Sequence, residues 1–78
     1  MENKIRLVWN FRGEDALKTA EHQLIHLVEF MKKENIPFLE HKTEKINDLH
    51  SICSICIYES NLDFVKNKLR PHRGFHAK

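Results

Sequence analysis

The sequence predicts a small α+β fold in which two helices pack on one face of a β-sheet, in the order β-α-β-β-α. Residues 4–11 alternate between apolar and polar side chains, which is typical of a half-buried strand. From residue 15 the apolar positions instead recur every three or four residues, as they do along an amphipathic helix. Two further strand-like runs and a short helical pattern follow, which completes a two-layer sandwich.

The first strand and the long helix have the clearest patterns. In the strand, every second side chain is apolar: Ile5, Leu7, Trp9 and Phe11. The Arg12-Gly13 pair ends this pattern, and Asp15 places negative charge where a helix would begin, which suits the helix dipole. We expect the helix over about residues 15–34, because Pro37 cannot continue it. Its apolar side is formed by Ala16, Leu17, Ala20, Leu24, Leu27, Val28, Phe30 and Met31.

The second half of the chain predicts a hairpin and a short helix. Strands are expected at Phe38–Thr43 and Leu49–Tyr58, with a turn at Ile46–Asp48 between them. Ser60 or Asn61 would cap the second helix, and Pro71 would end it. Residues 1–71 then form one domain, and residues 72–78 are expected to be a flexible basic tail.

The order of the elements restricts the topology. A right-handed crossover through the long helix places the first and third strands side by side, with the second strand at an edge. This arrangement resembles the ferredoxin-like split βαβ fold, with its last strand missing or rudimentary near residues 74–77. The resemblance covers most of the chain but carries no functional motif. The sheet face without helices must be polar, covered by a ligand or paired with another subunit.

The charge is distributed unevenly along the chain. Residues 1–65 contain eight Lys or Arg and eleven Asp or Glu, whereas residues 66–78 contain five basic residues and no acid. Such a segment can bind phosphate backbones. The candidate nucleic-acid-binding residues are Lys66, Lys68, Arg70, Arg73 and Lys78.

Two motifs resemble metal sites, but each lacks a feature that such a site needs. Cys53 and Cys56 form a C-x-x-C motif within a strand, where side chains three positions apart point to opposite faces. His22 and His26 resemble the zincin H-E-x-x-H motif, but Gln23 replaces the glutamate that acts as general base. We therefore expect no metal and no cofactor. If a metal were bound, His22, His26 and Glu29 would be its ligands.

A small-ligand site, if the chain has one, is expected where the first strand meets the long helix. Strand ends beside helix starts leave crevices in layered folds. The candidate ligand-binding residues there are Asn10, Arg12, Asp15 and His22.

The sequence favours a binding or regulatory function. No nucleophile–base pair or phosphate loop is recognisable, so we expect no enzymatic activity. No apolar run is long enough for a membrane span, no signal-peptide pattern is present, and the two cysteines do not form a secreted disulfide framework. We expect a small cytoplasmic domain that self-associates through its open sheet face or an edge strand. The alternative is a nucleic-acid-associated protein that uses residues 66–78.

Overall fold

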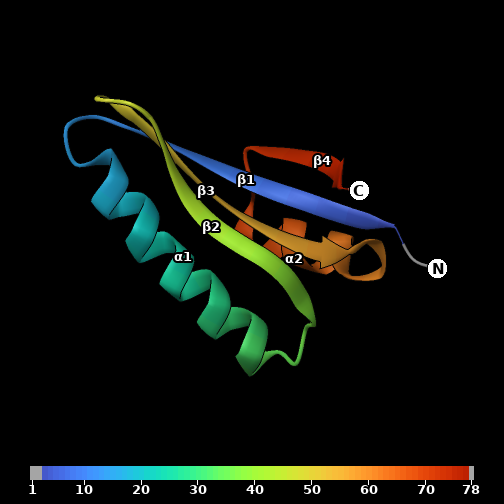
Figure 1. Cartoon of the computed structure of the whole chain (residues 1–78). Coiled ribbons are helices and arrows are strands. Elements are labelled where there is room, and N and C mark those ends of the chain that lie inside the picture. Colours follow the sequence, from blue (N-terminus) through green and yellow to red (C-terminus); the bar gives the residue numbers. More distant parts are fainter. Residues whose placement is uncertain (1–2, 78) are drawn as a thin grey trace.

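The computed structural model describes residues 3–77, with only the backbone described at residues 76 and 77. Figure 1 shows a twisted β-sheet with the long helix α1 lying along it. The elements are β1 (Lys4–Arg12), α1 (Ala16–Lys33), β2 (Phe38–Asn47), β3 (His50–Tyr58), a short 3-10 helix (Glu59–Asn61), α2 (Leu62–Leu69) and β4 (Arg73–Ala77). The protein is a small α+β fold, as the sequence predicts.

The strands form one antiparallel sheet in the order β2-β3-β1-β4. β1 and β3 pair along their full length, from Lys4 opposite Tyr58 to Arg12 opposite His50. The helix α1 connects β1 to β2, and β3 lies between these two strands. The prediction that the first and third strands are neighbours, with the second strand at an edge, is confirmed.

The C-terminal segment differs from the prediction. The expectation that residues 72–78 form a flexible tail is wrong for Arg73–Ala77, which form β4. Of the two alternatives for the last strand, missing or rudimentary near residues 74–77, the structure shows the second, as a strand of five residues. This strand pairs with β1, with Arg73 opposite Val8, and the backbone N–H of His72 donates a hydrogen bond to the carbonyl oxygen of Val8 (2.9 Å). Without β4, the central strand β1 would have an unpaired edge. Lys78 lies outside the described residues.

The core lies between the helices and one face of the sheet. Alternate side chains of β1 and β3 point into it, and residues of both helices cover them. Its buried members are Ile5, Leu7, Trp9, Ala20, Leu27, Met31, Ile36, Cys53, Ile55, Ile57 and Val65. Each large apolar side chain buried here contributes roughly 1.5–3 kcal/mol to folding. Both helices therefore lie on the same side, which leaves the other face of the sheet without helices.

The long helix buries most of the side that its periodicity predicts, but Leu17, predicted on that side, is exposed. Ala20, Leu27 and Met31 are completely buried, and α1 packs mainly against β3. Ile25, which lies off the apolar side, is 56% exposed. Among the described residues, no helix has the length and apolar character needed to cross a bilayer.

Two neighbouring turns lie at one end of the sheet. Gly13 adopts a φ of +115° between β1 and α1, a conformation that favours glycine. Its N–H donates a hydrogen bond to the carbonyl oxygen of Leu49 (2.9 Å), which lies in the turn of the β2–β3 hairpin. That turn is at Asp48–Leu49, so β2 extends to Asn47 and is longer than predicted.

Candidate functional site

The sheet face without helices carries a groove of about 320 Å³ that is lined by residues of all four strands. Val8 of β1 and Ser54 of β3 are the most deeply buried side chains that line it, with exposed fractions of 6% and 1%. Ile46 on β2 and Phe75 on β4 line it from the two edge strands and are 47% and 48% exposed. The groove therefore has a sheltered centre and two exposed apolar side chains at its edges.

The hydroxyl of Ser54 is the most unusual polar group in this groove. Its Oγ is buried and has no hydrogen-bond partner within the described part of the chain. A buried hydroxyl without a partner costs roughly 1–3 kcal/mol, so native proteins rarely leave one unpaired.

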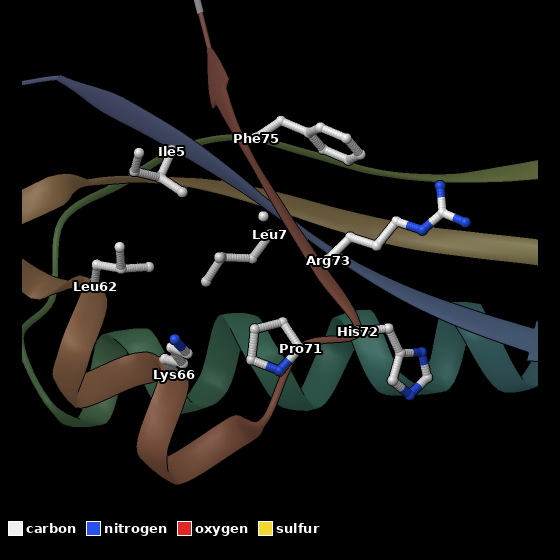
Figure 2. A pocket seen from close by; sticks show the side chains of 9 residues that line it. Ile5, Leu7, Leu62, Lys66, Pro71, His72, Arg73 and Phe75 are labelled. Carbon is white, nitrogen blue, oxygen red and sulfur yellow. The ribbon is translucent and has the colours of Figure 1, made fainter.

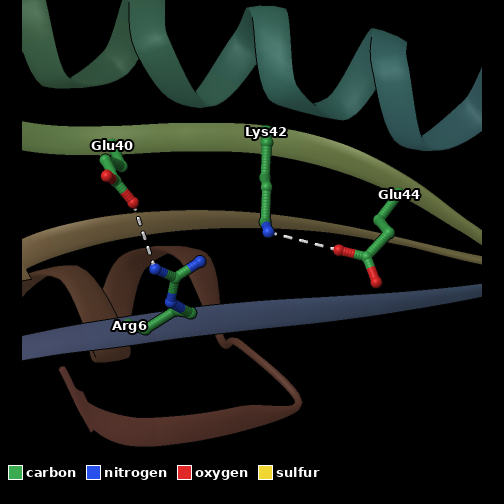
Figure 3. A network of polar contacts seen from close by, with 4 residues as sticks. All are labelled: Arg6, Glu40, Lys42 and Glu44. Atoms are coloured by element: carbon green, nitrogen blue, oxygen red, sulfur yellow. Dashed lines mark hydrogen bonds and ion pairs between the residues drawn. The ribbon is translucent and has the colours of Figure 1, made fainter.

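Two ion pairs lie on the same face (Figure 3). Arg6 of β1 reaches across β3 to Glu40 of β2 (Nη2 to Oε2, 3.3 Å), and Lys42 pairs with Glu44 along β2 (Nζ to Oε1, 3.2 Å). Both pairs are substantially exposed, so each contributes about 0–1 kcal/mol to stability. Their main effect is to order long polar side chains over the sheet.

The charged groups at the two edges of this face differ in whether they are paired. On β2, Glu40 and Glu44 form ion pairs with Arg6 and Lys42. On β4, Arg73 lines the groove and has no acidic partner in the described residues. The open face therefore has glutamates in ion pairs at its β2 edge and an arginine without such a partner at its β4 edge.

Asn10 connects three strands at one end of the groove. Its Oδ1 lies 3.0 Å from Nε2 of His50 on β3, and its backbone N–H donates a hydrogen bond to Nδ1 of His72 (2.8 Å). His72 immediately precedes β4, so these contacts fix the position at which the C-terminal strand joins the sheet. The sequence predicts Asn10 as a ligand contact, and in the structure its side chain contacts His50.

The predicted small-ligand residues do not meet at one cavity. Asn10 lines the open-face groove, whereas Arg12, Asp15 and His22 line neither this groove nor the hollow beneath β4 described below. Asp15 is in the N-cap position of α1, but its side chain makes no capping hydrogen bond. His22 is exposed on the outer side of the helix. The structure therefore separates a set of residues that the sequence places close together.

The residues with metal-binding chemistry are also dispersed. The rings of His22 and His26 have centroids 5.1 Å apart, and no group of three His, Cys, Asp or Glu suited to a metal occurs among the described residues. Cys53 lies opposite Trp9 on the core side, and Cys56 lies opposite Arg6 on the open face. Burial raises the pKa of the Cys53 thiol to about 11, so it remains protonated near neutral pH. Its chemistry is that of a small buried apolar side chain.

The basic segment is divided between two layers of the molecule. Lys66 and Lys68 are exposed on α2, and Arg70 ends this helix in the left-handed conformation (φ 47°). Arg73 lies on β4, and Lys78 is outside the described residues. The five predicted nucleic-acid contacts therefore do not lie along one element.

A second hollow, of about 340 Å³, lies beneath β4 on the helix side of the sheet (Figure 2). Ile5 and Leu7 of β1 and Leu62 of α2 give it an apolar lining. Lys66 and Arg73 also line it, and Figure 2 shows them on α2 and β4, the two elements that border the hollow. Arg73 and Phe75 line both this hollow and the groove, so β4 separates two candidate sites.

Sequence patterns gave little indication of these two sites. The residues that define them, Ser54 and Phe75, become informative only once β3 and β4 have their places in the sheet. The one local signal was the alternation from Arg73 to Phe75 after Pro71, which is too short to indicate a strand by itself. No family model matches the chain, and comparisons with curated proteins and with solved structures found no match.

Proposed function

We propose that the protein is a small cytoplasmic binding domain without enzymatic activity, and that a second copy of the chain covers its open sheet face. The fold is proposed to be ferredoxin-like, because α1 and the β2–β3 hairpin give the split βαβ arrangement and α2 leads to β4 beside β1. The observation that carries the functional proposal is the open face itself, which exposes Ile46 at its β2 edge and Phe75, beside Arg73, at its β4 edge.

One symmetric arrangement places the two edge strands over each other. A two-fold axis parallel to the strands would place β2 of one copy over β4 of the other. Because such an axis keeps each residue's level along the strands, the segment from Glu40 to Glu44 would lie over Arg73 and Phe75 of the second copy, and the same contact would occur twice. Such a pairing brings the glutamates of β2 near Arg73, and it needs no other protein.

Association would also bury side chains that the open face exposes. Arg6 reaches over β3 to Glu40, and Lys42 pairs with Glu44, so long side chains extend over the buried Val8 and Ser54. Two stacked faces would enclose these side chains together with Ile46 and Phe75. A chain of 78 residues has a small core, and association would add buried apolar surface to it.

The absence of catalysis is proposed from the chemistry of the groove. Ser54 is the hydroxyl that lines it most deeply, and no base among the described residues is hydrogen-bonded to its Oγ. A serine nucleophile needs such a base to become reactive.

The experiment is analytical ultracentrifugation over a wide concentration range, with two matched variants. Ile46 and Ile25 are both exposed isoleucines, but Ile46 lines the open face and Ile25 lies on α1. We expect the wild-type chain and Ile25→Glu to dimerise, and Ile46→Glu to sediment as a folded monomer. A monomeric wild-type chain, or dimerisation that Ile46→Glu leaves unchanged, would contradict the proposal.

A second candidate function is contact with single-stranded nucleic acid. Arg73 and Phe75 lie on the same face of β4, and a cation next to an exposed aromatic ring suits a phosphate and a stacked base. The test is fluorescence anisotropy with a labelled oligonucleotide at low and moderate salt. Binding that weakens with salt and is lost in Arg73→Glu would support this function, whereas no binding at low salt would exclude it.

A further inference from the structure

The hollow beneath β4 results from incomplete cover by the helices. α1 packs over β3, β2 and β1, whereas α2 has eight residues and contributes one buried side chain, Val65. At the position of β4 next to Leu7, the residue is Gly74, so no side chain fills the space. A Cβ atom placed there would lie 3.5 Å from Cδ2 of Leu7 and 3.8 Å from Cγ2 of Ile5, which are ordinary contact distances.

The hollow has the size and lining of a small-ligand site. Its volume of about 340 Å³ lies at the lower end of the range for such sites. At about 30 Å³ for each atom of liquid-like packing, it has room for roughly ten non-hydrogen atoms. Ile5, Leu7 and Leu62 offer these atoms an apolar environment.

The ionisable side chains that line the hollow include no acid. They are Lys66, His72 and Arg73 (Figure 2). Neither Lys66 nor Arg73 forms an ion pair in the described part of the chain, whereas Arg6, Lys42 and Lys45 each have an acidic partner. The two cations beside this cavity are therefore available to a ligand.

His72 adds a donor to this set. Its Nδ1 accepts the hydrogen bond from the backbone N–H of Asn10 (2.8 Å), so the neutral ring carries its proton on Nε2. Lys66, His72 and Arg73 thus offer N–H donors, and no carboxylate lines the hollow.

From these observations we infer that the hollow beneath β4 binds a small organic anion with an apolar body, such as a short-chain carboxylate or alkyl phosphate. The apolar body would lie on Ile5, Leu7 and Leu62, and the anionic group would contact Lys66. The residues Leu62 and Lys66 line this hollow and not the open-face groove, whereas Arg73 lines both, so variants of Lys66 test this inference separately from the proposed dimer.

The experiment is a titration of the full chain with octanoate, octyl phosphate and octylamine, followed by the amide NMR signals of Lys66 and Gly74. We expect both signals to shift saturably with at least one of the anions and not with octylamine, which has the same chain but a positive charge. The anion that binds more tightly identifies the preferred head group. Absence of saturable shifts with both anions, or equal binding of octylamine, would overturn the inference.

Two sets of variants locate the site. Lys66→Glu should weaken anion binding by about tenfold or more, whereas Lys68→Glu, on the same helix but outside the hollow, should have a much smaller effect. Gly74→Leu should abolish binding by filling the hollow. Equal effects of the two lysine variants would overturn the inference even if Gly74→Leu fails to fold. Sedimentation of each variant shows separately whether the proposed dimer persists.

Discussion

Trp9 connects the sheet to the end of the second helix. Its indole N–H donates a hydrogen bond to the carbonyl oxygen of Leu69 (3.1 Å), and the side chain is 4% exposed. Leu69 is the last residue of α2, where backbone carbonyl groups lack helical partners. A single side chain therefore contributes both apolar burial and the hydrogen bond that holds this short helix against β1.

We predict that Trp9→Phe lowers the free energy of unfolding by about 1–3 kcal/mol, because it leaves the Leu69 carbonyl without its donor and removes buried volume. Urea denaturation followed by circular dichroism measures the change. Tyr58→Phe, which removes a hydroxyl from a half-buried ring, is the control and should change stability by no more than about 0.5 kcal/mol. Equal stability of Trp9→Phe and wild type would show that the hydrogen bond is unimportant.

The buried thiol of Cys53 predicts a dependence of stability on pH. Burial raises its pKa to about 11, above the value in the unfolded chain, so the native state keeps its proton over a range where the unfolded state loses it. Stability should therefore fall as the pH rises from about 9 to about 11. In Cys53→Ala this part of the decline should be absent, as denaturation midpoints at several pH values would show. Parallel pH profiles for the two proteins would contradict the assignment.

Among the elements, β4 differs most from the sequence prediction. The sequence predicts a solvated basic segment here, whereas the structure has a strand that pairs with one side of β1. This strand places Arg73 and Phe75 on the open face, and it borders both candidate sites. The backbone N–H and the ring of His72 anchor its start to Val8 and Asn10.

A chain that stops after Pro71 should be less stable by at least about 2 kcal/mol, since it loses several hydrogen bonds to β1 and exposes part of the core. Chemical denaturation of the full and shortened chains measures the difference. A flexible tail would leave the denaturation midpoint unchanged, and that result would contradict the presence of β4.

The elements that the sequence predicts well are those whose pattern reflects one-sided burial. β1 and α1 each bury a single face, so their periodicity is clear. β2 is an edge strand whose residues from Glu40 onward are exposed or only half-buried. Polar residues such as Glu40 and Lys42 therefore interrupt its alternation, and the predicted strand ends at Thr43, before the observed end at Asn47. β4 has five residues and depends on pairing with a strand more than sixty positions away, which no local pattern records.

The candidate sites were harder to predict than the elements for a related reason. Both are formed by residues that come together only through the sheet. Ser54 is an ordinary strand serine until its position beside Val8, on the face without helices, is known. The predicted ligand contacts at the β1–α1 turn, such as Arg12 and Asp15, are close in sequence, but both are exposed and line neither site.

At the scale of the whole molecule, the two faces of the sheet have different roles. The helix side contains the core and the small hollow with its basic lining. The open side has a buried centre between two edges that expose Ile46 and Phe75, and we propose that a second copy covers it. We therefore predict a symmetric dimer with β2 of each copy next to β4 of the other, and an anion site on the helix side of each copy.

Paramagnetic broadening in a mixed sample tests whether β2 of one copy lies next to β4 of another. A nitroxide attached through His41→Cys labels β2 at an exposed position outside the open-face groove, and it labels selectively because Cys53 and Cys56 are 0% and 4% exposed. When labelled copies are mixed with unlabelled copies enriched in ¹⁵N, we predict broadening of the amide signal of Phe75 on β4 and none at Ile25 on α1. Unbroadened Phe75, or broadening at Ile25, would contradict the account.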